Sequence, residues 1–312
     1  MVRLGKGLSG PFESRAEKKM VDDHRTAGSP SVFDKEWQEA LAKADVRFLI
    51  YPTKASGRQA DLFEWIKAQQ IVEILEQFGV NSGAVLEYGC GSAGMSLFLA
   101  SLGFRCYICD LSIYAIKLAQ TNQFHHGFKD NIIPGAVANA LLLPYAHNSV
   151  DVIMSFGLLE HFELEPLDQL INESIRVLKP GGVFIADIIP GPERLNGRTF
   201  GLVINYLGSL AAHILSGKWV KIPQLFRQYF ENYYETALDD REWISILSKY
   251  NLSDIQVNVC RPFLPLALSG AWEKMYARMI LHFLTFHNRF DRANNWLTRR
   301  WGWMYLVRGR KP

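Results

Sequence analysis

Residues 85–94 constrain the fold more than any other part of the chain. They read Val-Leu-Glu-Tyr-Gly-Cys-Gly-Ser-Ala-Gly, so an apolar strand runs directly into a glycine-rich turn. Gly89, Gly91 and Gly94 follow the spacing G-x-G-x-x-G, and Glu87 stands two positions before the first of them. Glycine lets the chain turn sharply and lets its backbone lie against a ligand, because no Cβ stands in the way. The pattern therefore predicts a strand-to-helix turn that holds a ligand.

The chain around this turn alternates between strands and helices. Apolar runs predict strands at 84–88, 105–110, 132–137, 150–156, 183–189, 253–261 and 302–309. Segments with helical spacing predict helices at 60–78, 92–102, 113–121, 167–177 and 236–250. Such alternation predicts an α/β fold, in which helices cover both faces of a parallel sheet. Ligands of these sheets bind beyond the C-terminal ends of the strands, where the glycine turn lies.

Three segments fall outside this alternation. Residues 1–59 are expected to form an N-terminal arm with a short helix near 33–45, and residues 60–312 a single domain. Two insertions, 191–235 and 264–300, interrupt that domain. Both are rich in apolar residues, and the run from Thr199 to Gly217 contains no Lys, Arg, Asp or Glu.

Composition narrows the class of protein. With 48% hydrophobic and 21% charged residues, the chain resembles an ordinary globular protein and not a disordered one. The N-terminus lacks an apolar segment of secretory length, and four scattered cysteines do not suggest a disulfide framework, so we expect a cytoplasmic protein. Residues 191–312 hold 17 Lys and Arg against 9 Asp and Glu, which indicates either an acidic partner or a solvated basic surface.

Asp110 narrows the class of ligand. It ends the second predicted strand, 21 positions after Gly89. A carboxylate there can accept hydrogen bonds from both hydroxyls of a ribose, although it could also cap the next helix. Nicotinamide, flavin and S-adenosylmethionine sites all share this turn, so the pattern alone predicts only an adenosine-type ligand.

Four further blocks distinguish among these ligands. They are Asn139–Tyr145, Asn148–Ile153, Phe156–Phe162 and Val177–Gly182, in that order. Together they resemble the class I S-adenosylmethionine-dependent methyltransferases, in the small-molecule branch of methyltransferase type 11 and the ubiquinone and sterol methyltransferases. The resemblance covers about residues 80–190. It implies a Rossmann-like, seven-stranded, mostly parallel sheet with an antiparallel last strand, and S-adenosylmethionine as the cofactor.

The resemblance also assigns roles to individual residues. It implies that Glu87 and the backbone of Gly89, Cys90 and Gly91 hold the methionine part of the cofactor, that Asp110 binds the ribose and that Leu111 packs on the adenine. It further implies that Asn139 and the Ala140 amide face the adenine edge, and that Phe156 supports the amino-acid moiety. The family usually has Asp where this chain has Asn139, so we expect an altered affinity and not its loss.

His161 is the candidate catalytic residue. It follows the fourth strand, where cofactor and substrate meet, and could act as a general base if the methyl acceptor is a hydroxyl; the alternative is that it only shapes the pocket. We expect no metal site. Cys106 and Cys109 should point to opposite faces of their strand, and His125 and His126 should be solvated in a loop.

The two insertions are expected to form helical lids. In the family's sheet the strands before them finish on the cofactor side, so both insertions should emerge above the site. A hydrophobic lid would suit an apolar acceptor; contact with a membrane surface and simple helix packing are the alternatives. Asn205, Ser209 and His213 argue against a membrane span. Side chains of the lids that could touch substrate are Tyr233, Tyr234, His213 and His282.

The sequence thus predicts transfer of a methyl group from S-adenosylmethionine to a medium-sized, partly apolar small molecule, at oxygen. One alternative is a non-catalytic methyltransferase-like protein that uses the lid as a partner interface. Another is a nucleotide-sugar or nicotinamide oxidoreductase. Nucleic acid is not expected as a partner, because the basic residues are dispersed and there is no Asn/Asp-Pro-Pro-aromatic block.

Overall fold

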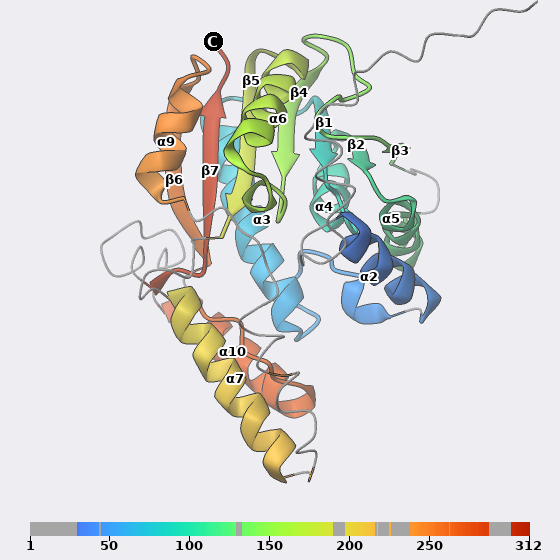
Figure 1. Cartoon of the computed structure of the whole chain (residues 1–312), viewed down its shortest axis with the longest axis vertical. Coiled ribbons are helices and arrows are strands. Elements are labelled where there is room, and N and C mark those ends of the chain that lie inside the picture. The colour runs from blue at the N-terminus through green and yellow to red at the C-terminus, as the bar shows by residue number, and fades with distance from the viewer. Residues whose placement is uncertain are drawn as a thin grey trace, which may run out of the picture.

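Seven strands form a single sheet in the computed structural model of this chain (Figure 1). The structure describes residues 30–43, 45–128, 133–189, 197–215, 217, 225, 238–261, 263–286 and 301–312. The strands are β1 (Ala84–Tyr88), β2 (Arg105–Asp110), β3 (Gly135–Val137), β4 (Val150–Ser155), β5 (Leu178–Ile188), β6 (Ser253–Arg261) and β7 (Met304–Arg310). The helices of the sheet layers are α3 (Gln59–Gln77), α4 (Gly94–Ser101), α5 (Ile113–His125), α6 (Leu164–Val177) and α9 (Asp240–Ser248).

The strand order is β3-β2-β1-β4-β5-β7-β6. Strands β1 to β5 pair in parallel, while β7 lies antiparallel between β5 and β6. Since β6 is antiparallel to β7, it runs with the first five strands. The predicted Rossmann-like sheet with an antiparallel last strand is therefore confirmed.

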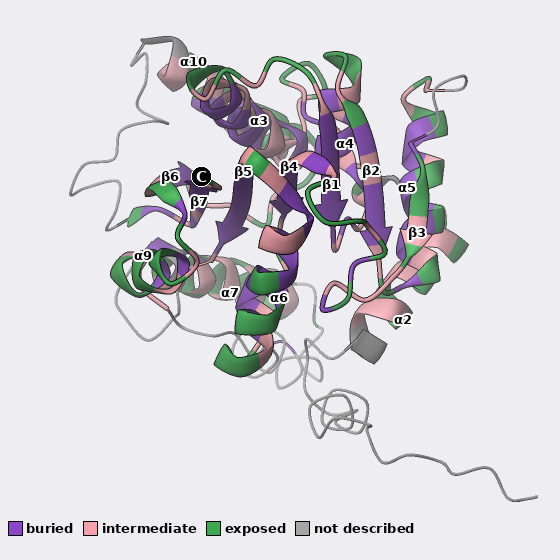
Figure 2. Ribbon diagram, turned by 90° about the horizontal axis from the view of Figure 1, so that it is seen from above, coloured by how far each residue is buried: buried purple, intermediate pink, exposed green. Residues whose placement is uncertain are grey.

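Helices cover both faces of the sheet, which leaves most of its residues buried (Figure 2). Val85, Ile108 and Met154 belong to the apolar cluster on the face of α3, α4 and α5. Leu86 and Trp243 belong to the cluster on the opposite face, with α6 and α9. Cys106 and Cys109 fall in different clusters, as their positions on one strand predict.

Several boundaries differ from the sequence prediction, and two of them have a clear structural cause. β5 begins at Leu178 and not at Val183, so the Lys-Pro-Gly-Gly segment is part of the strand. The reason is tertiary pairing: Gly181 N donates to Lys311 O at 2.8 Å, and Lys311 N donates to Gly182 O at 2.9 Å. The helix predicted to end near residue 121 continues to His125, so His125 lies in α5 and not in a loop; the last turn closes through His126 N and Asn122 O at 3.0 Å.

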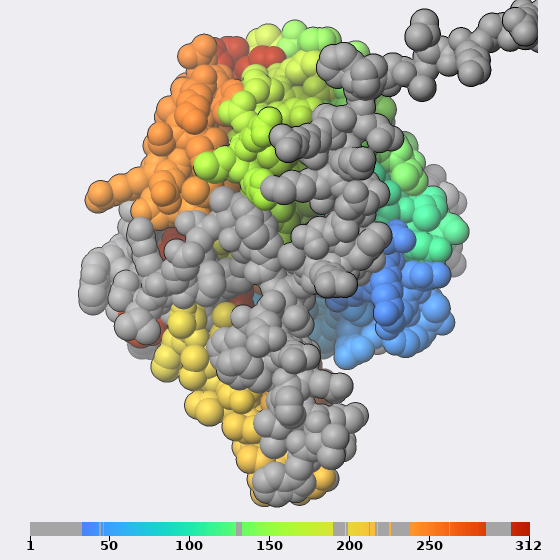
Figure 3. Space-filling model, in the orientation of Figure 1, coloured from blue at the N-terminus to red at the C-terminus, as the bar shows by residue number. Residues whose placement is uncertain are grey.

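Three further helices lie near the end of the sheet at which β1, β2 and β4 finish (Figure 1). They are α2 (Pro30–Ala42), α7 (Gly197–Leu215) and α10 (Gly270–Phe286). Residues Ala277 and Ile280 of α10 pack on Leu62 and Ile66 of α3. The space-filling view shows α7, in yellow, reaching below the rest of the described chain (Figure 3).

Only part of the predicted lids can be compared with the structure. Tyr233, Tyr234 and residues 287–300 lie outside the described residues. Asn205 of α7 joins the two insertions, because its side chain donates to Pro265 O at 2.7 Å and accepts from Ala267 N at 2.8 Å. Among the helices that the structure describes, none combines the length and the apolar character that crossing a membrane requires.

Candidate functional site

The glycine turn lies directly beyond β1. Gly89 and Gly91 have φ angles of +62° and +48°, in the left-handed region that favours glycine. Gly89 is also crowded, since a Cβ there would lie 2.7 Å from Leu158 Cδ2. Any other residue at position 89 would therefore displace the turn that follows β4.

Glu87 lies buried in β1, just before the turn. Its Oε2 accepts hydrogen bonds from the Ser96 amide, at 3.0 Å, and from the Ser96 hydroxyl. Burial raises the pKa of Glu87 to about 7, although the Ser96 hydrogen bonds and the positive charge of Lys67 act in the opposite direction. The Glu87 carboxyl is thus poised to exchange a proton near neutral pH.

Asp110 ends β2, beside the glycine turn. Its Oδ2 accepts from Gly91 N at 3.1 Å, and its Oδ1 accepts from Ser112 N at 2.9 Å. Burial raises the pKa of Asp110, and these two backbone hydrogen bonds partly offset the effect. Leu111 follows with half of its side chain exposed, 50%, which leaves an apolar surface next to the carboxylate. A carboxylate beside an exposed apolar side chain can bind a sugar and an aromatic base together.

Asn139 and Ala140 follow β3, the neighbour of β2. Asn139 Oδ1 accepts from Leu141 N at 2.9 Å, and Asn139 O accepts from Leu142 N at 3.0 Å. One oxygen lone pair of the Asn139 side chain is therefore used to shape the turn. Ala138 N donates to Asp110 O at 2.9 Å, which ties this segment to the end of β2.

Phe156 and His161 lie beyond β4. Phe156 packs on the cluster that contains Val85 and Met154. His161 belongs to the short helix η2 (Leu159–His161), and its ring meets the ring of Phe33 edge to face, with centroids 5.2 Å apart. The His161 ring is thus covered from the N-terminal side by α2.

Helix α2 contributes residues to the site that the sequence analysis did not identify. Asp34 accepts from the hydroxyl of Ser112 at 2.5 Å. The ring of Trp37 lies 3.5 Å from where a Cβ on Gly91 would be. Phe33, Asp34 and Trp37 lie on one face of α2, which turns toward the ends of β1, β2 and β4. In the sequence, this apolar face of α2 is indicated by Phe33 and Trp37, which stand four residues apart in a largely polar segment.

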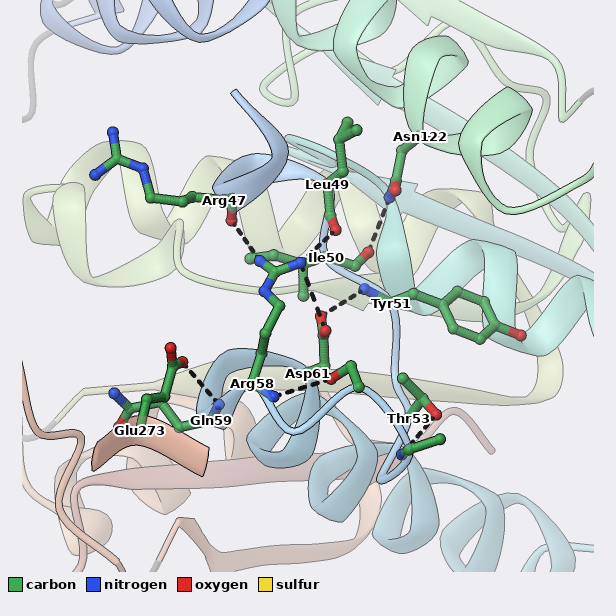
Figure 4. Close-up of polar contacts among 12 residues, drawn as sticks. Arg47, Leu49, Ile50, Tyr51, Thr53, Arg58, Gln59, Asp61, Asn122 and Glu273 are labelled. Carbon is green, nitrogen blue, oxygen red and sulfur yellow. Dashed lines mark hydrogen bonds and ion pairs between the residues drawn. The ribbon is translucent and has the colours of Figure 1, made fainter. Parts of the chain in front are cut away.

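Hydrogen bonds hold the segment between α2 and α3 across the glycine turn (Figure 4). Asn122 Nδ2 donates to both Ile50 O and Ser92 O, each at 2.8 Å. Arg58 donates to the carbonyl of Leu49, and Asp61 Oδ1 accepts from Tyr51 N. Ile50 O lies 2.5 Å from the position of a Cβ on Gly94, which explains the third glycine of the motif.

The structure therefore gathers most of the predicted site residues at one edge of the sheet. These are Gly89, Cys90, Gly91, Asp110, Leu111, Asn139, Ala140, Phe156 and His161, with Glu87 immediately below them. The predicted lid histidines lie farther out: His213 Nδ1 is 2.8 Å from Ser209 O on its own helix, and His282 is exposed on α10. Within the described part of the chain, no three His, Cys, Asp or Glu side chains are grouped as metal ligands.

Known proteins match the central part of this chain. Residues 86–186 match the family model described as a methyltransferase domain. Methyltransferase GfsG of Streptomyces halstedii is 32% identical over 120 residues, which cover 38% of this chain and 42% of that protein. Norajmaline N-methyltransferase of Rauvolfia serpentina is 28% identical over 132 residues, which cover 42% and 44%. The chain thus spans less than half the length of these relatives.

A solved structure with a similar fold is magnesium protoporphyrin IX methyltransferase from Synechocystis, with bound S-adenosylhomocysteine. It is 13% identical, covers 81% of this chain and 84% of its own, and has a TM-score of 0.47.

The residues present fit an adenosine-containing cofactor with a cationic amino-acid end. Glu87 and Asp110 provide carboxyl groups, Leu111 provides an apolar surface, and the glycines leave space where a Cβ would intrude. S-adenosylmethionine, the cofactor of methyltransferase domains, meets this description, and residues 86–186, which hold these groups, match the model of such a domain.

Proposed function

We propose that this protein transfers a methyl group from S-adenosylmethionine to a medium-sized, partly apolar small molecule. The observation that carries the proposal is the pairing of the glycine turn with Asp110, at the ends of two adjacent parallel strands, inside the segment that matches a methyltransferase domain. Ligands of such sheets bind at this edge.

In this proposal each predicted site residue keeps its role. Glu87 and the backbone of Gly89, Cys90 and Gly91 hold the methionine part, and Asp110 holds the ribose. Leu111, Asn139 and Ala140 contact the adenine, and Phe156 supports the amino-acid end. Helix α2 covers the turn and excludes water. The cofactor supplies an electrophilic methyl group on its sulfonium, so the protein mainly has to orient the acceptor.

We assign the acceptor atom as oxygen and His161 as its general base. His161 lies beyond β4, on the side of the sheet edge where the acceptor must approach. The apolar character of the acceptor is supported by α7, which carries no charged residue from Thr199 onward, and by the apolar packing of α10 on α3. The protein would act on this acceptor in the cytoplasm.

Calorimetric titration with S-adenosylhomocysteine tests the cofactor. The expected result is saturable binding of one molecule per chain, with no comparable binding of a nicotinamide dinucleotide or a flavin. A folded sample that binds a dinucleotide and not S-adenosylhomocysteine would overturn the proposal in favour of an oxidoreductase. With binding established, transfer of labelled methyl from S-adenosylmethionine into an organic extract of cells distinguishes an enzyme from a non-catalytic binding protein.

One observation favours a second role, contact with a partner or a membrane surface. Phe200, Leu207 and Leu215 of α7 are exposed apolar side chains, as is Trp272 of α10. Lys274 and Arg278 are exposed on the same helix, α10, and basic side chains near an anionic lipid surface would add to such contact. Sedimentation with phosphatidylglycerol vesicles tests the membrane contact; protein that stays in the supernatant at low salt argues against it.

A further inference from the structure

Four charged side chains, two of them buried and two partly buried, lie together between α3 and the ends of β5 and β6. Lys67 Nζ lies 2.8 Å from Asp187 Oδ2 and 2.9 Å from Glu64 Oε2, and Arg261 forms an ion pair with Glu64. The side chains of Lys67 and Asp187 are 4% and 1% exposed. With two cations and two anions, the cluster balances its own charge.

This cluster is not explained by stability alone. A buried ion pair can often be replaced by apolar side chains without loss of stability, because removing the charges from water costs about as much as their attraction returns. Asp187 interrupts the apolar run 183–188 of β5, a strand whose faces are both covered. Burial by itself would lower the pKa of Lys67, but the facing carboxylates of Asp187 and Glu64 raise it, so Lys67 stays charged.

Both members of the central pair touch the turn that follows β4. Asp187 Oδ1 accepts from Gly157 N at 2.6 Å. Lys67 Nζ lies 4.3 Å from the centroid of the Phe156 ring, within the range of a cation–π contact. The strand register explains this, because Ser155 of β4 pairs with Ala186 of β5, which brings Gly157 and Asp187 close together.

Gly157 has no side chain that could anchor this turn. Gly157 is exposed, has a φ of +66°, and a Cβ on it would meet nothing within 4 Å. The next residue, Leu158, packs over Gly89, and His161 closes the same segment. A shift at Gly157 would therefore move the cofactor turn and the candidate base relative to each other.

We propose that Lys67 and Asp187 are positioning residues for the acceptor side of the site, and that they do so by holding the turn 156–161 against Gly89. This role rests on the proposed methyl transfer. It links the position of His161 to the buried ion pair of Lys67 and Asp187. Asp187 fixes the backbone at Gly157, and Lys67 fixes both Asp187 and the ring of Phe156.

The same balance of charge limits what the acceptor can be. Lys67 and Arg261 each face a carboxylate, so their charge is already compensated within the cluster. The cluster does not provide a net positive site for a carboxylate or phosphate group. An uncharged acceptor on this side of the turn agrees with the apolar contacts between α3 and α10.

Asp187→Asn and Asp187→Ala form a matched pair for the test. The asparagine keeps an oxygen that can accept from Gly157 N, whereas alanine removes it. Hydrogen exchange of the Gly157 amide, followed by NMR, should be about ten-fold faster or more in Asp187→Ala and within about three-fold of wild type in Asp187→Asn. S-adenosylhomocysteine affinity and the rate of methyl transfer should fall in the same order. Equal Gly157 exchange in wild type and a folded Asp187→Ala protein would overturn the proposal.

Lys179→Met is the control, because Lys179 also pairs with an aspartate between β4 and β5, at 2.9 Å from Asp151, but at the opposite end of these strands. This control should leave Gly157 exchange unchanged. If Asp187→Ala does not fold, Lys67→Met combined with Asp187→Asn removes both charges while keeping the acceptor oxygen. Faster exchange of neighbouring amides at 156–158 in that protein supports the proposal, and unchanged exchange contradicts it. Neither cofactor nor acceptor is needed for this readout, so its outcome is separate from whether the wild-type protein binds S-adenosylhomocysteine.

Discussion

The buried carboxyl of Glu87 should make the stability of this protein depend on pH near neutrality. Burial raises the pKa of Glu87 from 4.5 to about 7 in the folded protein. Between these two values the folded chain keeps a proton that the unfolded chain releases. The stability that this proton contributes is fully present below pH 4.5 and is lost as the pH rises through 7.

The size of the effect follows from the two pKa values. They differ by about 2.5, and one pKa unit is equivalent to about 1.4 kcal/mol, so the full effect on the free energy of unfolding is roughly 3 to 4 kcal/mol. Most of this effect falls between pH 5 and pH 8. Glu87→Gln cannot ionise but keeps an oxygen for the Ser96 amide and hydroxyl. The variant should therefore gain stability relative to wild type as the pH rises.

Urea unfolding followed by tryptophan fluorescence at pH 5, 6, 7 and 8 measures this difference. Glu173→Gln is the matched control, because the hydrogen bond from Arg176 lowers the pKa of Glu173. The stability from Glu173 is present above the unfolded pKa and is lost only at more acidic pH, so this control should differ from wild type by a constant amount from pH 5 to 8. A constant difference for Glu87→Gln as well would refute the reasoning.

Three other substitutions test the cofactor side of the site. Asp110→Ala should weaken S-adenosylhomocysteine binding at least about ten-fold by calorimetry, since a hydrogen bond to a charged group contributes roughly 1.5–3 kcal/mol; unchanged affinity would place the ribose elsewhere. Gly89→Ala should destabilise the fold more than Gly79→Ala, because both glycines have positive φ but only the first would meet Leu158, at 2.7 Å; equal losses in urea unfolding would show that crowding plays no part. Trp37→Ala should speed dissociation of S-adenosylhomocysteine about ten-fold in stopped-flow measurements, because about 1.4 kcal/mol of apolar contact corresponds to that factor; an unchanged rate would mean that α2 is not a cover.

Local chemistry explains what could be predicted from the sequence. The bounds of β1, β2 and β6 are those expected, because β1 and β2 are largely apolar, β6 alternates polar and apolar residues, and each strand ends at a charged residue or before a glycine. The arrangement of Gly89 and Asp110 followed from a general property of parallel sheets, whose strand ends meet at one edge. The predicted start of β5, at Val183, was wrong. Pro180 and Gly181 indicate a turn locally, but pairing with Lys311 extends the strand back to Leu178.

Contacts between distant segments explain what was missed. The docking of Trp37 over Gly91 depends on tertiary packing, which no local periodicity encodes. Lys67 and Asp187 are 120 positions apart, and a lysine in an amphipathic helix suggests a solvated side chain. In the sequence, the charged Asp187 inside the apolar run 183–188 is the feature that indicates a buried charge. The identity of the methyl acceptor, the role of His161 and the function of the two lids stay predictions.

The position of β7 in the sheet also limits the order in which the last strands can pair. In the sheet as described, β6 pairs with β7 alone, although β7 comes later in the chain. Strand β6 therefore has no partner in this sheet until β7 is present. Arg261, at the end of β6, forms the ion pair with Glu64, so the charge cluster depends on β7 as well. A chain that lacks β7 leaves the edge of β5 unpaired, where other chains can add.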